Sequence, residues 1–137
     1  MKKIILFTHA FLFTVLISFA QQSTVNYMLE INEDHPTSFR DDNERVNLYF
    51  TIPGLINPEE TTTLLNKFQK FGGVEEISIT SVNTSGTSFY MIFYSDAKFN
   101  FFKKLFITND VVQILFFGEL YDIDTIEPET ILNKISL

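Results

Sequence analysis

The residues best suited to acid–base or metal chemistry lie in two acidic stretches, one of them around a histidine. The first stretch surrounds His35 and supplies five carboxylates: Glu33, Asp34, Asp41, Asp42 and Glu44. The second lies near the end of the chain and supplies three more: Glu119, Asp122 and Asp124. Carboxylate clusters can hold calcium, and a histidine beside them can bind a metal or transfer a proton. Neither stretch has the glycine or the spacing of an EF-hand loop, so a solvated acidic surface is the default interpretation.

Other arrangements that support catalysis are missing from the sequence. The chain has no cysteine, which excludes disulfides, thiolate metal sites and cysteine nucleophiles. No serine stands in a Gly-x-Ser-x-Gly turn, and no glycine-rich loop is suited to a phosphate. Two carboxylates could act as acid and base in glycoside hydrolysis, but spacing singles out no pair. We expect a protein that is not an enzyme and needs no cofactor. A hydrolase or metal-dependent enzyme using the acidic stretches is an alternative.

The first twenty residues have the composition of an export signal. Lys2 and Lys3 form a basic start, residues 4–17 are mostly apolar, and Ser18 and Ala20 place small side chains where a signal peptidase cleaves. A retained anchor is the competing interpretation, although the apolar stretch is short for a hydrocarbon layer of about 30 Å. We expect cleavage after Ala20, a periplasmic or secreted protein, and no stable membrane anchor after cleavage.

The charge of the mature protein limits its partners. Loss of Lys2 and Lys3 would change the net charge from −7 to −9. Nucleic acids and anionic lipid surfaces both require a cationic patch, so neither is an expected partner. The remaining length suits one domain, which we place at residues 46–137 after an N-terminal extension at 21–45.

The clearest pattern in the chain is a strand, a tight turn and a helix over residues 46–73. Val46, Leu48, Phe50 and Ile52 alternate with polar residues, which is typical of a strand with one buried face. Pro53 and Gly54 end the strand, and a helix start follows in which Asn57 caps, Pro58 takes the first position and Glu60 completes a capping box. The helix has an apolar stripe and a glycine stop, formed by Leu64, Leu65, Phe68, Phe71, Gly72 and Gly73.

Alternating or apolar segments predict three further strands of the domain at residues 74–82, 87–94 and 111–117. A second helix is expected after a cap at Ser95 or Asp96, with a stripe formed by Phe99, Phe102, Leu105 and Phe106. Residues 25–31 alternate as an extra strand would, and residues 127–135 predict a short C-terminal helix.

The element order from residue 46 onward is strand, helix, strand, strand, helix, strand. This order predicts an α+β, ferredoxin-like βαββαβ fold with a four-stranded antiparallel sheet and two helices on one face. The extra N-terminal strand and the short C-terminal helix would be additions to it. Right-handed crossovers would place the first and third strands of the domain in the centre of the sheet.

One loop of this expected fold resembles a known family. The residues from Ile52 to Glu60, together with Gly73 and Val74 after the helix, look like a heavy-metal-associated domain. That family carries a Gly-Met-x-Cys-x-x-Cys loop here. In this chain Gly54 is retained, Leu55 replaces the methionine, and Asn57 and Glu60 stand at the cysteine positions. The resemblance implies the ferredoxin-like fold but no soft-metal binding, because soft metals require soft ligands.

The sheet face away from the helices is the candidate interaction surface. If Phe89, Met91 and Phe93 point to the helices, this face carries the candidate residues Tyr49, Tyr90, Tyr94, Leu115 and Phe117, beside Thr51, Ile92 and Gln113. Tyrosine is favoured at interfaces, so we expect a small exported non-catalytic module that binds a protein, a peptide or a small ligand. The chain could instead cover this face itself with residues 25–31 or 131–135. A structural subunit of an envelope assembly, joined through the edge strand at 74–82, is a further alternative.

Overall fold

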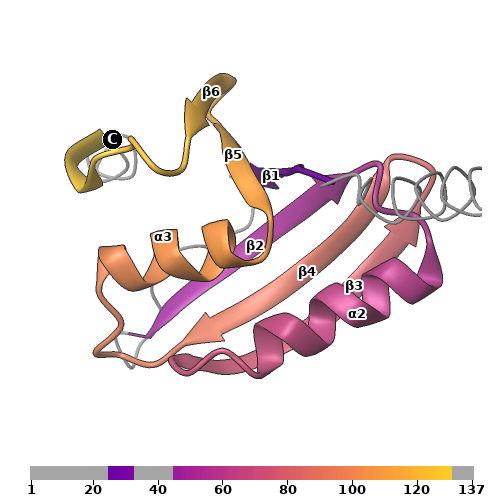
Figure 1. Ribbon diagram of the computed structural model, residues 1–137, viewed down its shortest axis with the longest axis horizontal. Helices are drawn as coiled ribbons and strands as arrows, with labels where there is room; N and C mark the ends of the chain where they lie inside the picture. The colour runs from indigo at the N-terminus through magenta and orange to yellow at the C-terminus, as the bar shows by residue number, and fades with distance from the viewer. Residues whose placement is uncertain (1–24, 33–44, 131–137) are drawn as a thin grey trace, which may run out of the picture.

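A sheet of six strands forms one layer of the protein, and two helices lie on one of its faces, in a computed structural model that describes residues 25–32 and 45–130 (Figure 1). The strands run in the order β3-β4-β2-β1-β5-β6 across the sheet. Their bounds are β1 Tyr27–Ile31, β2 Val46–Pro53, β3 Val74–Asn83, β4 Gly86–Phe93, β5 Val111–Phe116 and β6 Glu119–Asp122. The helices are α2 Pro58–Gln69 and α3 Phe99–Thr108, and residues 128–130 are also helical.

The prediction of a four-stranded antiparallel sheet was wrong. Strand β1 lies between β2 and β5, antiparallel to β2 and parallel to β5, so the sheet is mixed. Strand β6 then adds an edge beside β5. The backbone groups of β2 that would have bonded β5 bond β1 instead, and Leu29 and Ile31 of β1 join the core with 0% and 5% exposure. Residues 25–31 therefore extend the sheet and do not lie over its open face.

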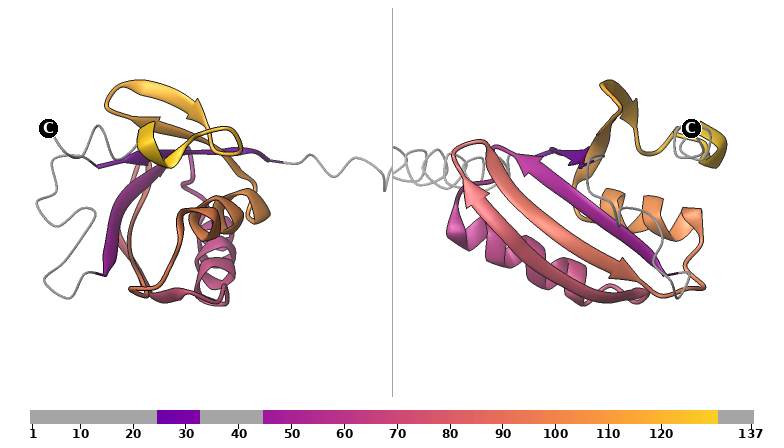
Figure 2. Two further views of the ribbon diagram at one scale, coloured as in Figure 1. Left: turned by 90° about the vertical axis from the view of Figure 1, so that its left-hand side faces the viewer. Right: turned by 180° about the vertical axis from the view of Figure 1, so that it is seen from behind.

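The helix-facing side of the sheet carries the core. Alternation in β2 and β4 puts Phe50, Phe89, Met91 and Phe93 on this side, where each is buried, as predicted. The ring of Phe50 stacks on Phe89 at 5.2 Å between centroids and meets Phe106 of α3 edge-on at 5.6 Å. Phe68 of α2 packs edge-on against Phe50 at 6.2 Å. These rings tie both helices to the same two strands, and the two views in Figure 2 show both helices on one side of the sheet.

Helix α2 begins and ends near the predicted positions. The Oδ1 atom of Asn57 accepts hydrogen bonds from the amides of Glu59 at 2.9 Å and Glu60 at 3.4 Å, and Pro58 is the first helical residue. No hydrogen bond among the described residues joins the Glu60 carboxylate to the Asn57 amide, so the cap is one-sided. Past the helix, Gly73 has φ +100°, and a Cβ there would lie 2.4 Å from the Phe101 ring. This turn therefore requires glycine.

Helix α3 starts later than the sequence indicated. Its N-cap is Lys98, which makes no side-chain capping bond, so Ser95 and Asp96 do not cap the helix. The chain first turns, with the Ala97 amide donating to the Tyr94 carbonyl at 3.0 Å. At the other end, the Asn109 side chain donates to the Leu105 carbonyl at 2.7 Å and Asp110 takes φ 63°, which closes the helix and starts β5.

A hairpin at the end of the sheet was not predicted. Strands β5 and β6 pair Phe116 with Glu119, which leaves Phe117 and Gly118 as a two-residue turn with φ of 49° and 72°. Tight hairpin turns of this kind need two residues at positive φ and usually use Asn-Gly or Asp-Gly. Because this turn has phenylalanine in its first position, it could not be recognised from the sequence.

Several predictions from the sequence concern residues outside the described ranges. These are the signal segment, His35 with the acids of the first acidic stretch, and the part of the C-terminal helix beyond residue 130.

Replacement of Phe50 by alanine should remove the residue on which both helices converge. We expect a loss of about 3–5 kcal/mol in the free energy of unfolding, because a buried aromatic leaves a cavity. Urea unfolding followed by far-ultraviolet circular dichroism measures it. Ile56→Ala, at a side chain that is 54% exposed, is the control and should change stability by less than about 0.5 kcal/mol. A loss below about 1 kcal/mol for Phe50→Ala would contradict the convergence of both helices on this ring.

Replacement of Asn57 by alanine should remove the acceptor for two amides of α2. The expected cost is about 1 kcal/mol of unfolding free energy, whereas Asn57→Asp keeps an acceptor oxygen and should cost little. Urea midpoints of the two variants provide the comparison. Equal losses in both variants would show that the side chain acts through something other than the cap.

Candidate functional site

Two stacked tyrosines lie in the middle of the sheet face that the helices leave open. Tyr49 of β2 and Tyr90 of β4 are directly opposite in register, and their rings stack with centroids 4.3 Å apart and planes inclined by 26°. Both are half-buried. Alternation places them opposite to Phe50 and Phe89, so the pair follows from the same register that fills the core. We call this surface the tyrosine face.

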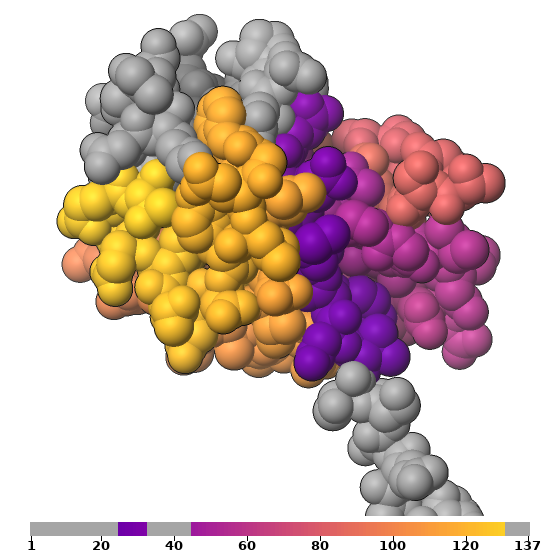
Figure 3. Space-filling model, turned by 90° about the horizontal axis from the view of Figure 1, so that it is seen from above, coloured from indigo at the N-terminus to yellow at the C-terminus, as the bar shows by residue number. Residues whose placement is uncertain are grey.

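The next row of the tyrosine face is polar. The hydroxyls of Thr51 and Ser88, which are opposite each other on β2 and β4, lie 2.8 Å apart. Glu30 of β1 is opposite Thr51 and is also in register with Leu115 of β5. Leu115 is half-buried and pairs in turn with Leu120 of β6, which is 54% exposed. Seen from above, β1 lies at the surface between the β5–β6 hairpin and the β2–α2 region (Figure 3).

The five candidate residues do not all lie at the centre of the tyrosine face. Tyr49 and Tyr90 touch, and Leu115 is on the same face with β1 between it and Tyr49. Tyr94 follows the end of β4, where its amide donates to the Gly73 carbonyl at 3.0 Å, and it is 48% exposed. Phe117 is in the β5–β6 turn, 45% exposed, with its ring edge-on to Phe116 at 4.7 Å. The centre of the face is therefore the tyrosine pair, and Tyr94 and Phe117 are at strand ends.

At one end of the tyrosine face, two side chains are almost completely buried. Ile92 of β4 and Asn47 of β2 are opposite in register and only 6% and 2% exposed. Ile92 was expected on the open surface, but it offers almost no contact area. Within the part of the chain that the structure describes, the buried Oδ1 of Asn47 has no hydrogen-bond partner. Sequence reasoning did not mark Asn47, because an asparagine in an alternating strand ordinarily faces solvent.

Charge on the tyrosine face is negative. Register places Glu76 of β3, Glu30 of β1 and Asp122 of β6 on the same side as the tyrosine pair. Arg45, just before β2, forms an ion pair with Glu75 at 3.4 Å. A partner that complements this face would therefore carry cationic groups.

Two residues of the second acidic stretch, Glu119 and Asp122, make local contacts. The Tyr121 hydroxyl donates to the Glu119 carboxylate, and the Gln113 amide donates to Asp122 Oδ1 at 3.4 Å. The Asp122 carbonyl accepts from the Ile126 amide at 3.0 Å, which closes the turn after β6. Among residues 25–32 and 45–130, no group of three or more acid, histidine or cysteine side chains could hold a metal ion. In the same ranges, no helix is long and apolar enough to cross a membrane.

On the helix-facing side of the sheet, one ionisable side chain, Tyr27, has a shifted pKa. Burial raises the pKa of Tyr27, with smaller contributions from the negative charges of Glu60 and Asp110. Tyr27 is partly buried against the core, and its amide donates to the Asp110 carbonyl at 2.7 Å. The neutral phenol is therefore favoured in the folded protein, in which Tyr27 packs against the core.

No protein-family model, curated protein or solved structure matches this chain. The resemblance to heavy-metal-associated domains stays a prediction. The residues at the cysteine positions have a local role in the structure: Asn57 caps α2, and Glu60 contributes one of the capped amides.

Stability at alkaline pH should depend on Tyr27. Because its folded pKa is raised, the unfolded chain releases this proton first, at about pH 10. The contribution of Tyr27 is complete below that pH and is lost as pH rises through the folded value. We expect the urea midpoint to fall less steeply above about pH 10 in Tyr27→Phe than in the wild type. Parallel declines in the two proteins would contradict the raised pKa.

Proposed function

We propose that this protein is a small exported, non-catalytic binding module that recognises a protein or peptide through its tyrosine face. The observation that carries the proposal is the half-buried, stacked pair of Tyr49 and Tyr90 on a sheet face that α2 and α3 do not cover. Tyrosine combines a large apolar ring with a polar end, and a stacked pair has little side-chain entropy left to lose on binding.

The surroundings of the pair define the chemistry of the partner. Hydroxyls of Thr51 and Ser88 adjoin the rings, and Leu115 extends the apolar area across the sheet. Glu30, Glu76 and Asp122 give the face a negative charge. A segment that presents an aromatic or aliphatic side chain to the tyrosine rings and a lysine or arginine to these carboxylates complements it.

Replacing the tyrosines should abolish this recognition without unfolding the protein. We would select binders from a random peptide display library on the wild-type protein and measure their affinities by fluorescence polarisation. Tyr49→Thr and Tyr90→Thr keep residues suited to strands and should each weaken the selected peptides about tenfold or more. The peptides should also be enriched in lysine or arginine next to an aromatic residue.

The control is Val82→Thr, a change of an exposed apolar residue on β3, at the opposite edge of the sheet from β6. It should leave the peptide affinities unchanged. Peptides that bind the tyrosine variants and the wild type equally would refute the proposed face. Loss of the native circular dichroism spectrum in Tyr49→Thr would mean that the pair is part of the core.

A further inference from the structure

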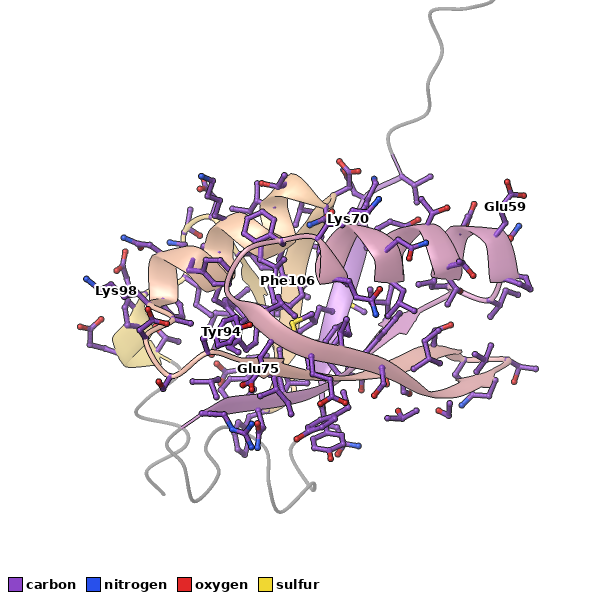
Figure 4. The ribbon with its side chains drawn as sticks, turned by 90° about the horizontal axis from the view of Figure 1, so that it is seen from below. Glu59, Lys70, Glu75, Tyr94, Lys98 and Phe106 are labelled. Atoms are coloured by element: carbon purple, nitrogen blue, oxygen red, sulfur yellow. The ribbon has the colours of Figure 1, made fainter. Side chains whose placement is uncertain are left out.

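The outer edge of β3 is a second surface with the features of an interface. Within residues 25–32 and 45–130, strand β3 ends the sheet and is hydrogen-bonded to β4 alone. It is ten residues long, which makes it the longest strand among the described residues. Figure 4, seen from below, looks onto this side of the molecule, with Glu75 near the beginning of the strand and α2 above the strand in the view. A free edge of this length presents a row of backbone donors and acceptors to solvent.

Strand β3 has only some of the features that keep edge strands from pairing with another chain. From Ile77 to Asn83 the strand has no charged residue and no proline. Ile79 and Val82 are 37% and 55% exposed. Natural edges are commonly protected from pairing by charged residues or by bulges. In β3 the charged residues Glu75 and Glu76 and one bulge lie at the beginning of the strand, and from Ile77 to Asn83 a second bulge is the only such feature.

That bulge determines which side chains share a face. The register with β4 shifts between Ile79 and Ser81, so that Thr80 is the inserted residue. Ile79 is opposite Phe89 and Val82 is opposite Thr87, both of which are buried on the helix-facing side. Ile79 and Val82 therefore point to the same side although they are three positions apart, where a regular strand would separate them.

We propose that a second copy of this chain pairs with β3 in antiparallel orientation, about a two-fold axis between Thr80 and Ser81. In this register Ile79 of each copy is opposite Val82 of the other, which gives two apolar cross-strand pairs on the helix side. In the same register Thr80 of each strand is opposite Ser81 of the other, so both strands carry one inserted residue between the two Ile79–Val82 pairs. A regular strand from another protein has no such insertion, so the bulge selects a second copy over an arbitrary extended segment.

The same axis sets the two α2 helices antiparallel to each other. Thr61 lies level with Val82, because its hydroxyl is 3.4 Å from that of Thr87. Phe68 lies level with Ile79, because its ring meets Phe89 with centroids 6.3 Å apart. The axis between Thr80 and Ser81 therefore passes the middle of α2, and the two helices run antiparallel beside each other.

In that arrangement the start of one α2 is level with the end of the other. Glu59 of one copy is level with Lys70 of the second along the helix axes, on the helix surfaces that face away from the sheet, and the relation occurs twice (Figure 4 labels both residues, at the two ends of the helix). Parallel pairing would instead set like charges against each other on both β3 and α2. In the antiparallel register the Glu76 carboxylate is level with the uncharged Ser85, which matters in a chain of net charge −7.

The first experiment measures association by sedimentation velocity and light scattering over a wide range of concentrations. We expect a reversible dimer in the wild type. Val82→Lys should weaken it about tenfold or more, since the new charge would be buried between the strands. Leu120→Lys is the matched control, because Leu120 has nearly the same exposure, 54% against 55%, on the opposite edge strand. It should leave the dimer unchanged.

The second experiment tests the register through the helices. Glu59→Lys alone places two lysines opposite each other at both contacts, and Lys70→Glu alone does the same with two glutamates. Each variant should dimerise about twofold more weakly than the wild type, with the difference shrinking at high salt, because the charges are exposed and only level with each other. An equimolar mixture of the two should form a heterodimer with restored affinity, because each contact then joins opposite charges.

These outcomes test the proposed dimer whether or not the tyrosine face binds a partner. A wild-type protein that stays monomeric at every concentration would refute it. So would a dimer that tolerates Val82→Lys or is lost in Leu120→Lys, because another surface would then be responsible. A Val82→Lys monomer with an unchanged urea midpoint supports the edge, and a mixture that shows no preference for the heterodimer would overturn the proposed register.

Discussion

The packing of phenylalanine rings between one face of the sheet and the two helices is the constraint on which the rest of the fold depends. Phe50 contacts Phe68 of α2, Phe89 of β4 and Phe106 of α3, so one side chain joins three other elements. Phe68 and Phe106 also meet each other at 5.6 Å, which fixes the two helices side by side. Most of the apolar burial of β2 and β4 is on this side, so their alternate residues include hydroxyls and tyrosines, with Asn47 and Ile92 buried at one end. The tyrosine face is a consequence of that asymmetry.

Local signals in the sequence were sufficient for most of the elements of this core. Alternation from Val46 to Ile52 predicted which residues of β2 share a face, and with that the side on which Tyr49 lies, because a strand has a period of two. Asn57 and Pro58 gave the start of α2 because capping involves only neighbouring residues. The side assigned to Phe89, Met91 and Phe93 was correct for the same reason, and it put Tyr90 on the same face as Tyr49.

Features that depend on distant residues could not be predicted in the same way. The alternation of β1 indicated a strand, but nothing within residues 25–31 specifies that it lies between β2 and β5. That position follows from the pairing of Ile31 with Phe50 and of Leu29 with Ile114, which are far apart in the chain. Strand β6 was missed because Phe117 adopts positive φ, which bulky side chains rarely do. The burial of Asn47 and Ile92 could not be predicted either, because alternation shows on which side of the sheet a residue lies but not how much of its side chain is exposed.

The geometry of the edge has a consequence for the tyrosine face. A two-fold axis that relates antiparallel edge strands of one continuous sheet is perpendicular to that sheet, so both pairs of helices lie on one side and both tyrosine faces on the other. Two copies joined at β3 would then present two equivalent binding surfaces in the same direction, separated by β3 and β4 of each copy. A partner with two suitable segments would bind such a pair more tightly than one copy, because the second contact is made within the complex. The contacts of Phe50 with Phe68, Phe89 and Phe106 hold both helices on one side of the sheet, so α2 and α3 do not obstruct either tyrosine face.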